Sequence, residues 1–151
     1  MSTVKIEFVG HEEHQSEPHR LHPCVSVYVL PPGSDDGTSH GFKVWATIDT
    51  GADYLYISPE LAAELDLPVV GKTDVNGDQD QPIYFGRLGI VGIEGTSDVR
   101  LVQRESRSVG LPFDVVLGRV LLNRLALEYS PSGDGCFLRM LDQRPGSVGA
   151  S

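Results

Sequence analysis

Apolar and polar positions alternate along much of this chain, which is the pattern of β-strands that bury one face. Val25, Val27 and Val29, for example, alternate with Ser26 and Tyr28. Similar strand-like runs occupy 4–9, 42–48, 54–57, 83–93, 98–103, 113–117, 127–129 and 137–141. Many short strands predict a mostly β protein, built as a small antiparallel barrel or sandwich.

Two segments interrupt this pattern and favour short helices. Ser58-Pro59-Glu60 is typical of a helix start, because serine caps free amides, proline suits the first turn and glutamate suits the positive end of the dipole. We expect this helix to end near Leu65, before a proline. The second helix, expected at 119–125, would direct three apolar side chains inward: Val120, Leu121 and Leu125.

Polar segments connect these elements. Residues 11–22 hold four histidines and are expected to form a loop, and 31–37 and 130–135 are rich in turn residues. The tail at 143–151 is small and polar, so we expect it to be disordered. We find no internal repeat, and we expect one domain over 1–142, with 1–41 the least characteristic part.

Composition and charge exclude several classes of function. The 151 residues carry a formal net charge of -9, which makes binding to nucleic acid or to an anionic membrane unfavourable. No secretory signal or membrane-spanning run is evident, so a cytoplasmic location is expected. Cys24 and Cys136 lie in no CxxC pair, and we expect both to be reduced and buried.

The candidate chemistry begins where an apolar strand runs directly into Asp49, Thr50 and Gly51. Glycine allows a sharp turn and a close approach of a ligand backbone, and threonine offers a hydroxyl beside a packing methyl group. The tripeptide alone is equally compatible with an ordinary turn between strands.

A second block, at 113–122, changes this balance: an apolar strand ending at Leu117 is followed by Gly118, Arg119 and an apolar helix. Together, Ile48-Asp49-Thr50-Gly51-Ala52-Asp53 and Leu117-Gly118-Arg119 resemble the two motifs of the retropepsin-like aspartic protease family. Their order and interval also match, and the resemblance extends over about 42–141. It implies a small closed antiparallel β barrel of the acid-protease type, with one or two short helices.

The resemblance also implies a role for each matched residue. Asp49 would be the catalytic carboxylate of an aspartic endopeptidase. Thr50, Gly51 and Ala52 would support the active-site loop, with the Thr50 hydroxyl reaching a partner subunit and Gly51 presenting its backbone to substrate. Asp53 and Arg119 would form an ion pair that braces the site, although an exposed arginine at that position is the plainer alternative. Leu117 and Gly118 would carry the second motif.

The chain contains one Asp-Thr-Gly, whereas the chemistry needs two carboxylates. The resemblance therefore implies a homodimer in which two copies of Asp49 share a proton and activate water against a peptide or protein substrate. Neither a metal nor another cofactor is expected. The strands at 4–9 and 137–141 would be available for the dimer contact.

A lid is also expected in this family, and its position would be the hairpin at 71–84, with Asn76, Gly77 and Asp78 at the tip. Asp74, Asp78 and Asp80 make this hairpin acidic, unlike the glycine-rich apolar tip of viral members. It would disfavour acidic peptides, or it is simply a solvated hairpin.

Two other functions stay open on the sequence alone. The fold could serve as a catalytically inactive module for peptide binding or dimerisation, as the unusual hairpin suggests. Metal binding by His11, His14, His19 and His22 is a more distant alternative, because their spacing matches no regular site. We expect Trp45 to belong to the core.

Overall fold

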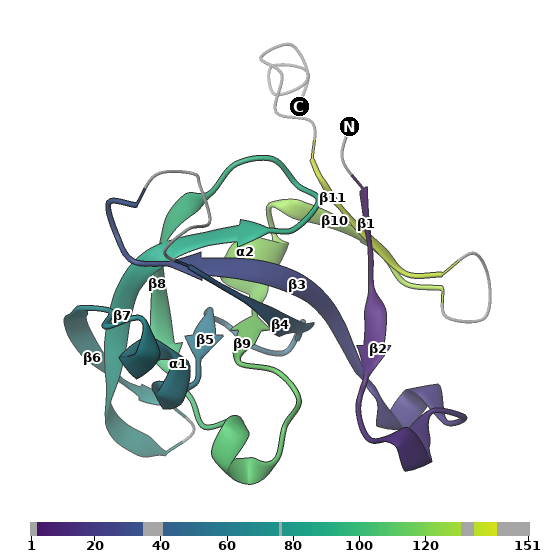
Figure 1. Cartoon of the computed structure of the whole chain (residues 1–151), viewed down its shortest axis with the longest axis horizontal. Coiled ribbons are helices and arrows are strands. Elements are labelled where there is room, and N and C mark those ends of the chain that lie inside the picture. Colours follow the sequence, from purple (N-terminus) through teal and green to yellow (C-terminus); the bar gives the residue numbers. More distant parts are fainter. Residues whose placement is uncertain (1–2, 35–40, 76, 131–134, 142–151) are drawn as a thin grey trace.

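The computed structural model describes residues 3–34, 41–75, 77–130 and 135–141. Several predicted features lie outside these ranges: Asn76, parts of the turns at 31–37 and 130–135, and the tail at 143–151 with its expected boundary at 142. The described chain is mostly β with two short helices, as the sequence predicted (Figure 1).

The elements follow one another along the chain as short strands with few helical turns. The strands are β1 (Thr3–Lys5), β2 (Glu7–Val9), β3 (His22–Leu30), β4 (Phe42–Ile48), β5 (Tyr56–Ile57), β6 (Val69–Val75), β7 (Asp78–Ile90), β8 (Ser97–Gln103), β9 (Val115–Leu117), β10 (Leu125–Glu128) and β11 (Phe137–Met140). The α-helices are α1 (Pro59–Glu64) and α2 (Arg119–Leu122), and 3-10 turns occur at Glu12–His14, Pro18–Arg20 and Arg107–Val109.

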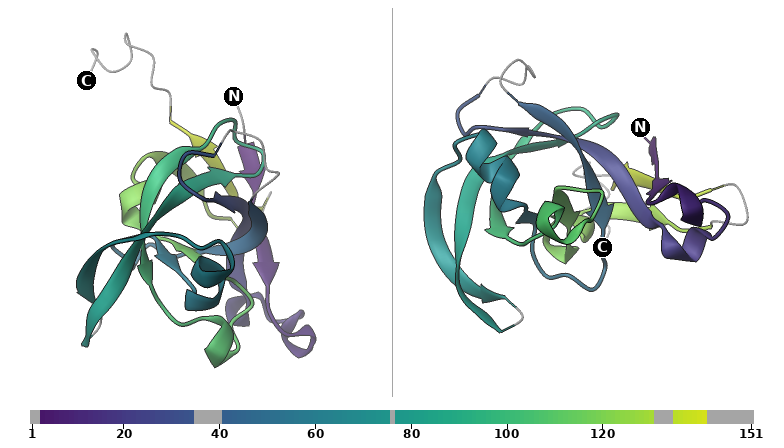
Figure 2. Two further views of the ribbon diagram at one scale, coloured as in Figure 1. Left: turned by 60° about the vertical axis from the view of Figure 1, so that its left-hand side comes forward. Right: turned by 60° about the horizontal axis from the view of Figure 1, so that its bottom comes forward.

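The larger sheet has the order β2-β3-β4-β9-β5-β8-β7-β6, and a further pairing between β3 and β7 closes part of it into a ring. Val27 opposes Ile90 in that closing pair. The ring surrounds apolar side chains with almost no exposed surface, among them Val27, Ile57, Leu101 and Leu117. This closure forms a small barrel (Figure 2), whose buried apolar side chains divide into a larger cluster and a smaller one around Tyr56 and Val116.

Two pairings differ from the expected antiparallel barrel: β4 runs parallel to β9, and β5 runs parallel to β8. The reason lies in the connections. The chain leaves β4 through a turn and returns as β5 on the other side of β9, so β9 separates the two strands. Local alternation of side chains says nothing about which distant strand is the neighbour, so the sequence pattern could not show this.

The first predicted strand, at 4–9, is also two strands. β1 belongs to a separate sheet of order β1-β11-β10, whereas β2 pairs with β3 in the larger sheet. Ile6, between them, is 2% exposed and its N–H donates to the Cys136 carbonyl at 2.8 Å. The buried side chain and this bond mark the point where the chain passes from one sheet to the other.

Helix α1 confirms the sequence prediction closely, because the Ser58 hydroxyl accepts a hydrogen bond from the Leu61 N–H and Pro59 opens the first turn. Helix α2 is shorter than predicted and ends at Leu122. Val120 is 55% exposed, so its expected inward position is wrong, whereas Leu125 is buried but belongs to β10. A single helical turn cannot direct every apolar residue to one side.

Candidate active site

Asp49 follows directly after β4, where that strand lies parallel to β9. Its N–H donates to the Leu117 carbonyl at 3.1 Å, and its own carbonyl accepts from the Ala52 N–H at 3.1 Å. The Gly51 N–H donates to Asp49 Oδ1 at 2.9 Å. The tight turn thus fixes the direction of one carboxylate oxygen and leaves the half-buried side chain at the surface of the barrel.

The second motif lies against the exit of this turn. The Arg119 N–H donates to the Ala52 carbonyl at 2.8 Å, and the Val120 N–H donates to the Asp53 carbonyl at 3.0 Å. A Cβ atom on Gly118 would lie 2.2 Å from the Tyr54 carbonyl oxygen. Glycine therefore permits the two segments to touch backbone to backbone.

Asp53 and Arg119 form an ion pair, and Arg119 Nη1 also donates to the Thr50 carbonyl at 2.9 Å. Both charged side chains are substantially exposed, so the pair contributes little to stability by itself. Its geometric effect is larger, because one guanidinium spans both ends of the turn that begins at Asp49.

Two cavities meet at Asp49. The first, of about 420 Å³, also touches the sheet β1-β11-β10, and its lining is Ile6, Pro23, Ile48, Asp49, Thr50, Leu127 and Tyr129. The second, of about 300 Å³, is lined by His22, Pro23, Thr47, Ile48, Asp49, Arg104, Glu105, Leu111, Phe113 and Val116. A carboxylate between two partly apolar cavities is accessible to water and to a ligand of peptide character.

The wall beside the second cavity contains residues that the sequence analysis did not single out. Tyr56 contacts Tyr54 edge to face, with ring centroids 6.4 Å apart, and the Arg104 guanidinium lies 5.3 Å above the Tyr56 ring. Burial raises the pKa of Tyr56, and the positive charge of Arg104 opposes that rise. Alternation at 54–57 marks these tyrosines only as strand residues, and Arg104 has no local signal because its partner is distant in sequence.

A further unexpected network anchors the start of β9. Asp114 accepts from the Ser58 hydroxyl at 2.8 Å and from Arg107 Nε at 2.6 Å, and Arg107 also pairs with Glu64 at 2.9 Å. The hydrogen bond from Arg107 to Asp114, and to a smaller degree its hydrogen bond to Glu64, raise the pKa of the Arg107 guanidinium. The network ties helix α1 to the strand that carries Leu117.

The segment that the resemblance assigns to a lid forms the hairpin of β6 and β7, with Gly77 in the left-handed region at φ +87°. Val75, beside the tip, is buried in a cluster with Tyr56, Val102 and Val116. Asp74 accepts from the Asp80 N–H at 3.1 Å, and Asp78 begins β7 at an exposed position. The hairpin therefore reaches the wall of the cavity beside Asp49, and its acidic side chains remain outside.

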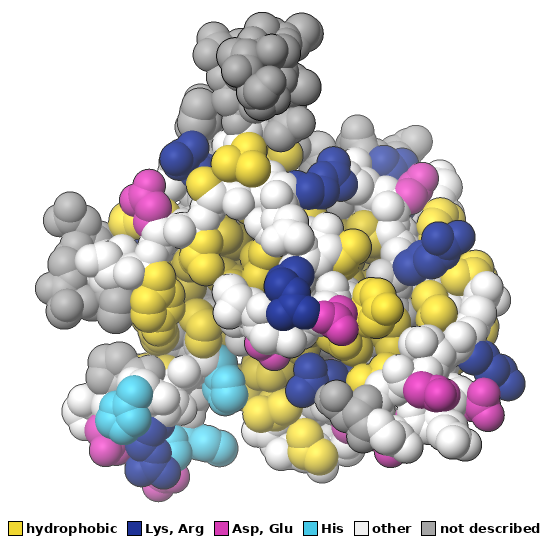
Figure 3. Space-filling model, turned by 180° about the vertical axis from the view of Figure 1, so that it is seen from behind, with side chains coloured by type: hydrophobic (Ala, Val, Ile, Leu, Met, Phe, Trp, Pro, Cys, Tyr) yellow, Lys and Arg dark blue, Asp and Glu magenta, His cyan; other side chains and the backbone are white. Residues whose placement is uncertain are grey.

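The histidine-rich segment is separate from this site except at one residue. It contains two 3-10 turns rather than a plain loop, and His22 belongs to β3, where its ring contacts Phe113. Histidine side chains gather toward one corner of the molecule in Figure 3. Within the described ranges, no three His, Cys, Asp or Glu side chains are grouped so that they could hold a metal ion.

Trp45 is half-buried and packs against the cluster that contains Tyr56, in keeping with its predicted place in the core. Both cysteines are free and buried, as predicted. No helix in the described part of the chain combines the length and apolar character needed to cross a bilayer.

Cys24 should be chemically inert in the folded protein. Burial raises the pKa of its thiol from 9.0 to about 12, so almost no reactive thiolate exists near neutral pH. We expect a Cys136→Ala variant to react with a disulfide reagent only after denaturant is added, as followed by absorbance. Rapid labelling of the native variant would contradict the buried position of Cys24.

Comparison with known proteins places this geometry in context. No protein-family model matches the chain, and no curated protein sequence matches it. Solved structures do match. A retropepsin-like aspartic protease from Rickettsia conorii is 16% identical, with a TM-score of 0.53 and coverage of 90% of both chains.

Two further solved structures are similar over somewhat less of the chain. The retroviral protease-like domain of Ddi1 from Leishmania major is 13% identical, with a TM-score of 0.48 and coverage of 82% of this chain and 97% of that one. EIAV protease is 15% identical, with a TM-score of 0.42 and coverage of 76% and 92%. The match to the Rickettsia structure, nearly complete in both directions, shows that this chain has the retropepsin-like fold.

Proposed function

We propose that this protein is an aspartic endopeptidase that works as a homodimer, with Asp49 as the catalytic carboxylate of each subunit. The observation that supports this most strongly is the setting of Asp49: a fixed turn presents its carboxylate between two cavities, one lined by Arg104 and Phe113 and one facing the sheet β1-β11-β10. The retropepsin-like fold is the second support.

The chemistry follows from bringing two such carboxylates together. Two adjacent carboxylates cannot both ionise easily, so the pair holds one proton. The ionised member takes a proton from water, which attacks the scissile carbonyl, while the protonated member donates a hydrogen bond to that carbonyl oxygen. In this scheme, Thr50, Gly51 and Ala52 hold the turn, and Asp53 and Arg119 brace it against Leu117 and Gly118.

The proposed dimer face lies on the sheet β1-β11-β10. The strand at 137–141 was expected to be available to a partner, but β11 is the central strand and both of its edges are already paired. Among the strands that the structure describes, β1 and β10 are the unpaired edges of this sheet. Leu127 and Tyr129, at the end of β10, line the same cavity as Asp49 and Thr50, so an apolar contact there would bring the two Asp49 loops together.

Tyr129→Asp should weaken the dimer by at least tenfold, because a central aromatic in an interface commonly contributes about 2 kcal/mol and a carboxylate would be desolvated there. Tyr129 is 59% exposed, and Val109, at 64%, offers a matched position away from this face. Sedimentation over a concentration series measures both variants. Equal association of Tyr129→Asp and Val109→Asp would rule out this face.

The function itself is tested by digestion of a denatured-protein library, with Asp49→Asn as the blank and products read by mass spectrometry. We expect new peptide ends with wild type and none with the blank, and the specific rate should fall on dilution as dimers dissociate. If wild type produces no new ends, the endopeptidase proposal is wrong. Peptide binding without cleavage would then support the inactive module that the sequence left open.

A further inference from the structure

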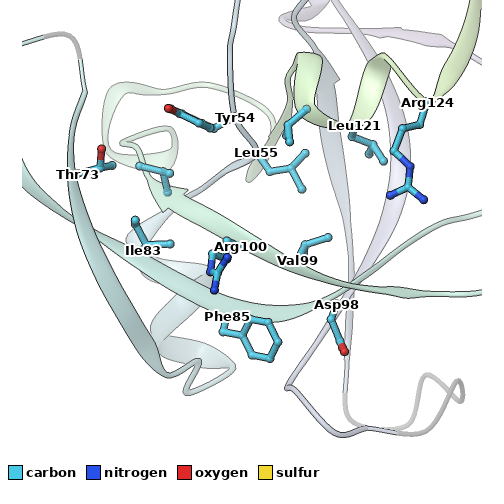
Figure 4. A pocket seen from close by; sticks show the side chains of 12 residues that line it. Tyr54, Leu55, Thr73, Ile83, Phe85, Asp98, Val99, Arg100, Leu121 and Arg124 are labelled. Atoms are coloured by element: carbon cyan, nitrogen blue, oxygen red, sulfur yellow. The ribbon is translucent and has the colours of Figure 1, made fainter.

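A separate concave surface lies outside the two cavities that meet at Asp49. It is a groove of about 530 Å³ between the β6–β7 hairpin, β8, the segment after the Asp49 turn, and helix α2 (Figure 4). Its apolar lining includes Leu55, Ile83, Phe85 and Leu121. A groove of this size matches the usual volume of a ligand site rather than a packing defect.

Two arginines give this groove its charge. Arg100 projects from β8, and Arg124 projects from just beyond α2, next to Leu121 in Figure 4. Within the described ranges neither guanidinium has a carboxylate partner, whereas Asp98, which also lines the groove, lies 3.5 Å from Arg87. Two unpaired cations beside apolar side chains are notable in a chain whose net charge is -9, and they complement a negatively charged ligand.

The groove lies next to the Asp49 turn through Tyr54, which follows Asp53 in the chain. Tyr54 lines it, and the Tyr54 ring contacts Tyr56, whose neighbours Val75 and Val116 lie on the side of the site. The backbone here is fixed, because the Val102 N–H donates to the Leu55 carbonyl at 2.9 Å. Tyr56 is buried and Tyr54 is 48% exposed, so a substrate chain that leaves the Asp49 turn past Asp53 and Tyr54 would reach the groove.

We propose that this groove binds an acidic segment of the polypeptide substrate, in which an aliphatic or aromatic side chain is flanked by Asp or Glu. The segment lies outside the residues immediately next to the scissile bond. This inference rests on the proposed function for its link to cleavage, but the binding step itself requires only the groove.

The groove and the hairpin tip then select charge in opposite ways. Asp74, Asp78 and Asp80 are exposed at the tip and disfavour acidic side chains there. Arg100 and Arg124 favour acidic side chains farther along the same substrate. The preference of the enzyme should therefore depend on the position of the charge in the peptide, not on the total charge.

Binding is tested without catalysis in the Asp49→Asn protein. The probes are two fluorescein-labelled peptides that are identical, with one leucine and one phenylalanine, except that two glutamates in one are glutamines in the other. We expect the glutamate peptide to bind about tenfold more tightly by fluorescence anisotropy, since each exposed ion pair contributes up to about 1 kcal/mol. Arg100→Gln with Arg124→Gln should remove that difference.

The matched control is Arg20→Gln with Lys43→Gln, which removes the same charge from exposed positions outside the groove. It should keep nearly the full preference for glutamate. If both double variants lose the preference equally, only long-range attraction is acting and the groove proposal is wrong. Equal binding of the two peptides to the Asp49→Asn protein would overturn it as well.

The cleavage assay separates the two proposals. If wild type cuts the library but the acidic preference away from the scissile bond is unchanged in the Arg100→Gln, Arg124→Gln variant, the groove proposal fails and the protease proposal stands. If wild type cuts nothing while the anisotropy difference persists and depends on the two arginines, the protease proposal fails and the groove proposal stands.

Discussion

Replacing Asp49 with asparagine should reduce peptide cleavage by about 10³-fold or more, because the amide can neither take a proton from water nor share one with its mate. Asparagine has nearly the same shape, and its side-chain oxygen can still accept the hydrogen bond from the Gly51 N–H. We therefore expect the fold and the dimer to survive. Initial rates on a peptide found by library digestion measure the loss.

The matched control is Asp66→Asn. Asp66 is an exposed aspartate just after helix α1, and its φ of +50° is one that asparagine adopts readily. This variant should cleave at the wild-type rate. Equal rates for Asp49→Asn and wild type would show that the cleavage comes from another group or from a contaminant.

Mixing the subunits tests whether the site belongs to the dimer. When equal amounts of wild type and Asp49→Asn exchange freely, about a quarter of the dimers retain two aspartates. The rate should therefore fall to about a quarter of the rate of wild type at the same total protein concentration, not to half. A value of half would mean that each chain works alone.

The parts of the structure that the sequence predicted correctly depend on local chemistry. Ser58 caps helix α1 as expected, because capping needs only the next few residues. The turn at Asp49 and the end of the strand at Gly118 were likewise predicted, since an acid or a glycine after an apolar strand favours a turn. The ion pair of Asp53 with Arg119 was implied by the family resemblance, whereas the hydrogen bonds from the Arg119 and Val120 N–H groups to the Ala52 and Asp53 carbonyls were not predicted.

The parts that the sequence did not predict depend on distant neighbours. The passage from β1 to β2 at Ile6 requires Cys136, far along the chain, to accept its N–H. The exposure of Val120 follows from a helix only one turn long, which nothing in the apolar run 120–122 reveals. Arg100 and Arg124 look like ordinary surface charges until the fold places them around one groove.

The charge arrangement on this chain also shows why composition is a coarse guide. A net charge of -9 suggests that acidic ligands are disfavoured everywhere, yet the wall near Asp49 holds Arg104 and the adjoining groove holds Arg100 and Arg124. Local potential in a concave site is set by the nearest side chains, because salt screens more distant charges. The charge of a preferred ligand must therefore be inferred from the side chains around the site.

Replacing Gly118 with alanine should have the largest effect on stability of any single methyl group added near the site. The new Cβ would lie 2.2 Å from the Tyr54 carbonyl oxygen and 2.8 Å from that of Ala52, and both atoms are backbone. They cannot rotate away as a flexible side chain could, so β9 and the Asp49 turn must separate. We expect a loss of about 3 kcal/mol, or roughly 10 °C in the melting temperature.

The backbone conformation of Gly118 shows that steric crowding, and not backbone strain, would cause the expected loss of stability. Its φ of -93° and ψ of -173° are extended values that alanine adopts readily, so backbone strain would not cause the loss of stability. Gly71→Ala is the matched control, because its nearest neighbour would be the end of the Ile83 side chain at 3.4 Å. Thermal unfolding should show little change for Gly71→Ala and a clear loss for Gly118→Ala. If the two variants melt together, the two motifs are not in backbone contact, and the bracing of the Asp49 turn by the second motif would have to be abandoned.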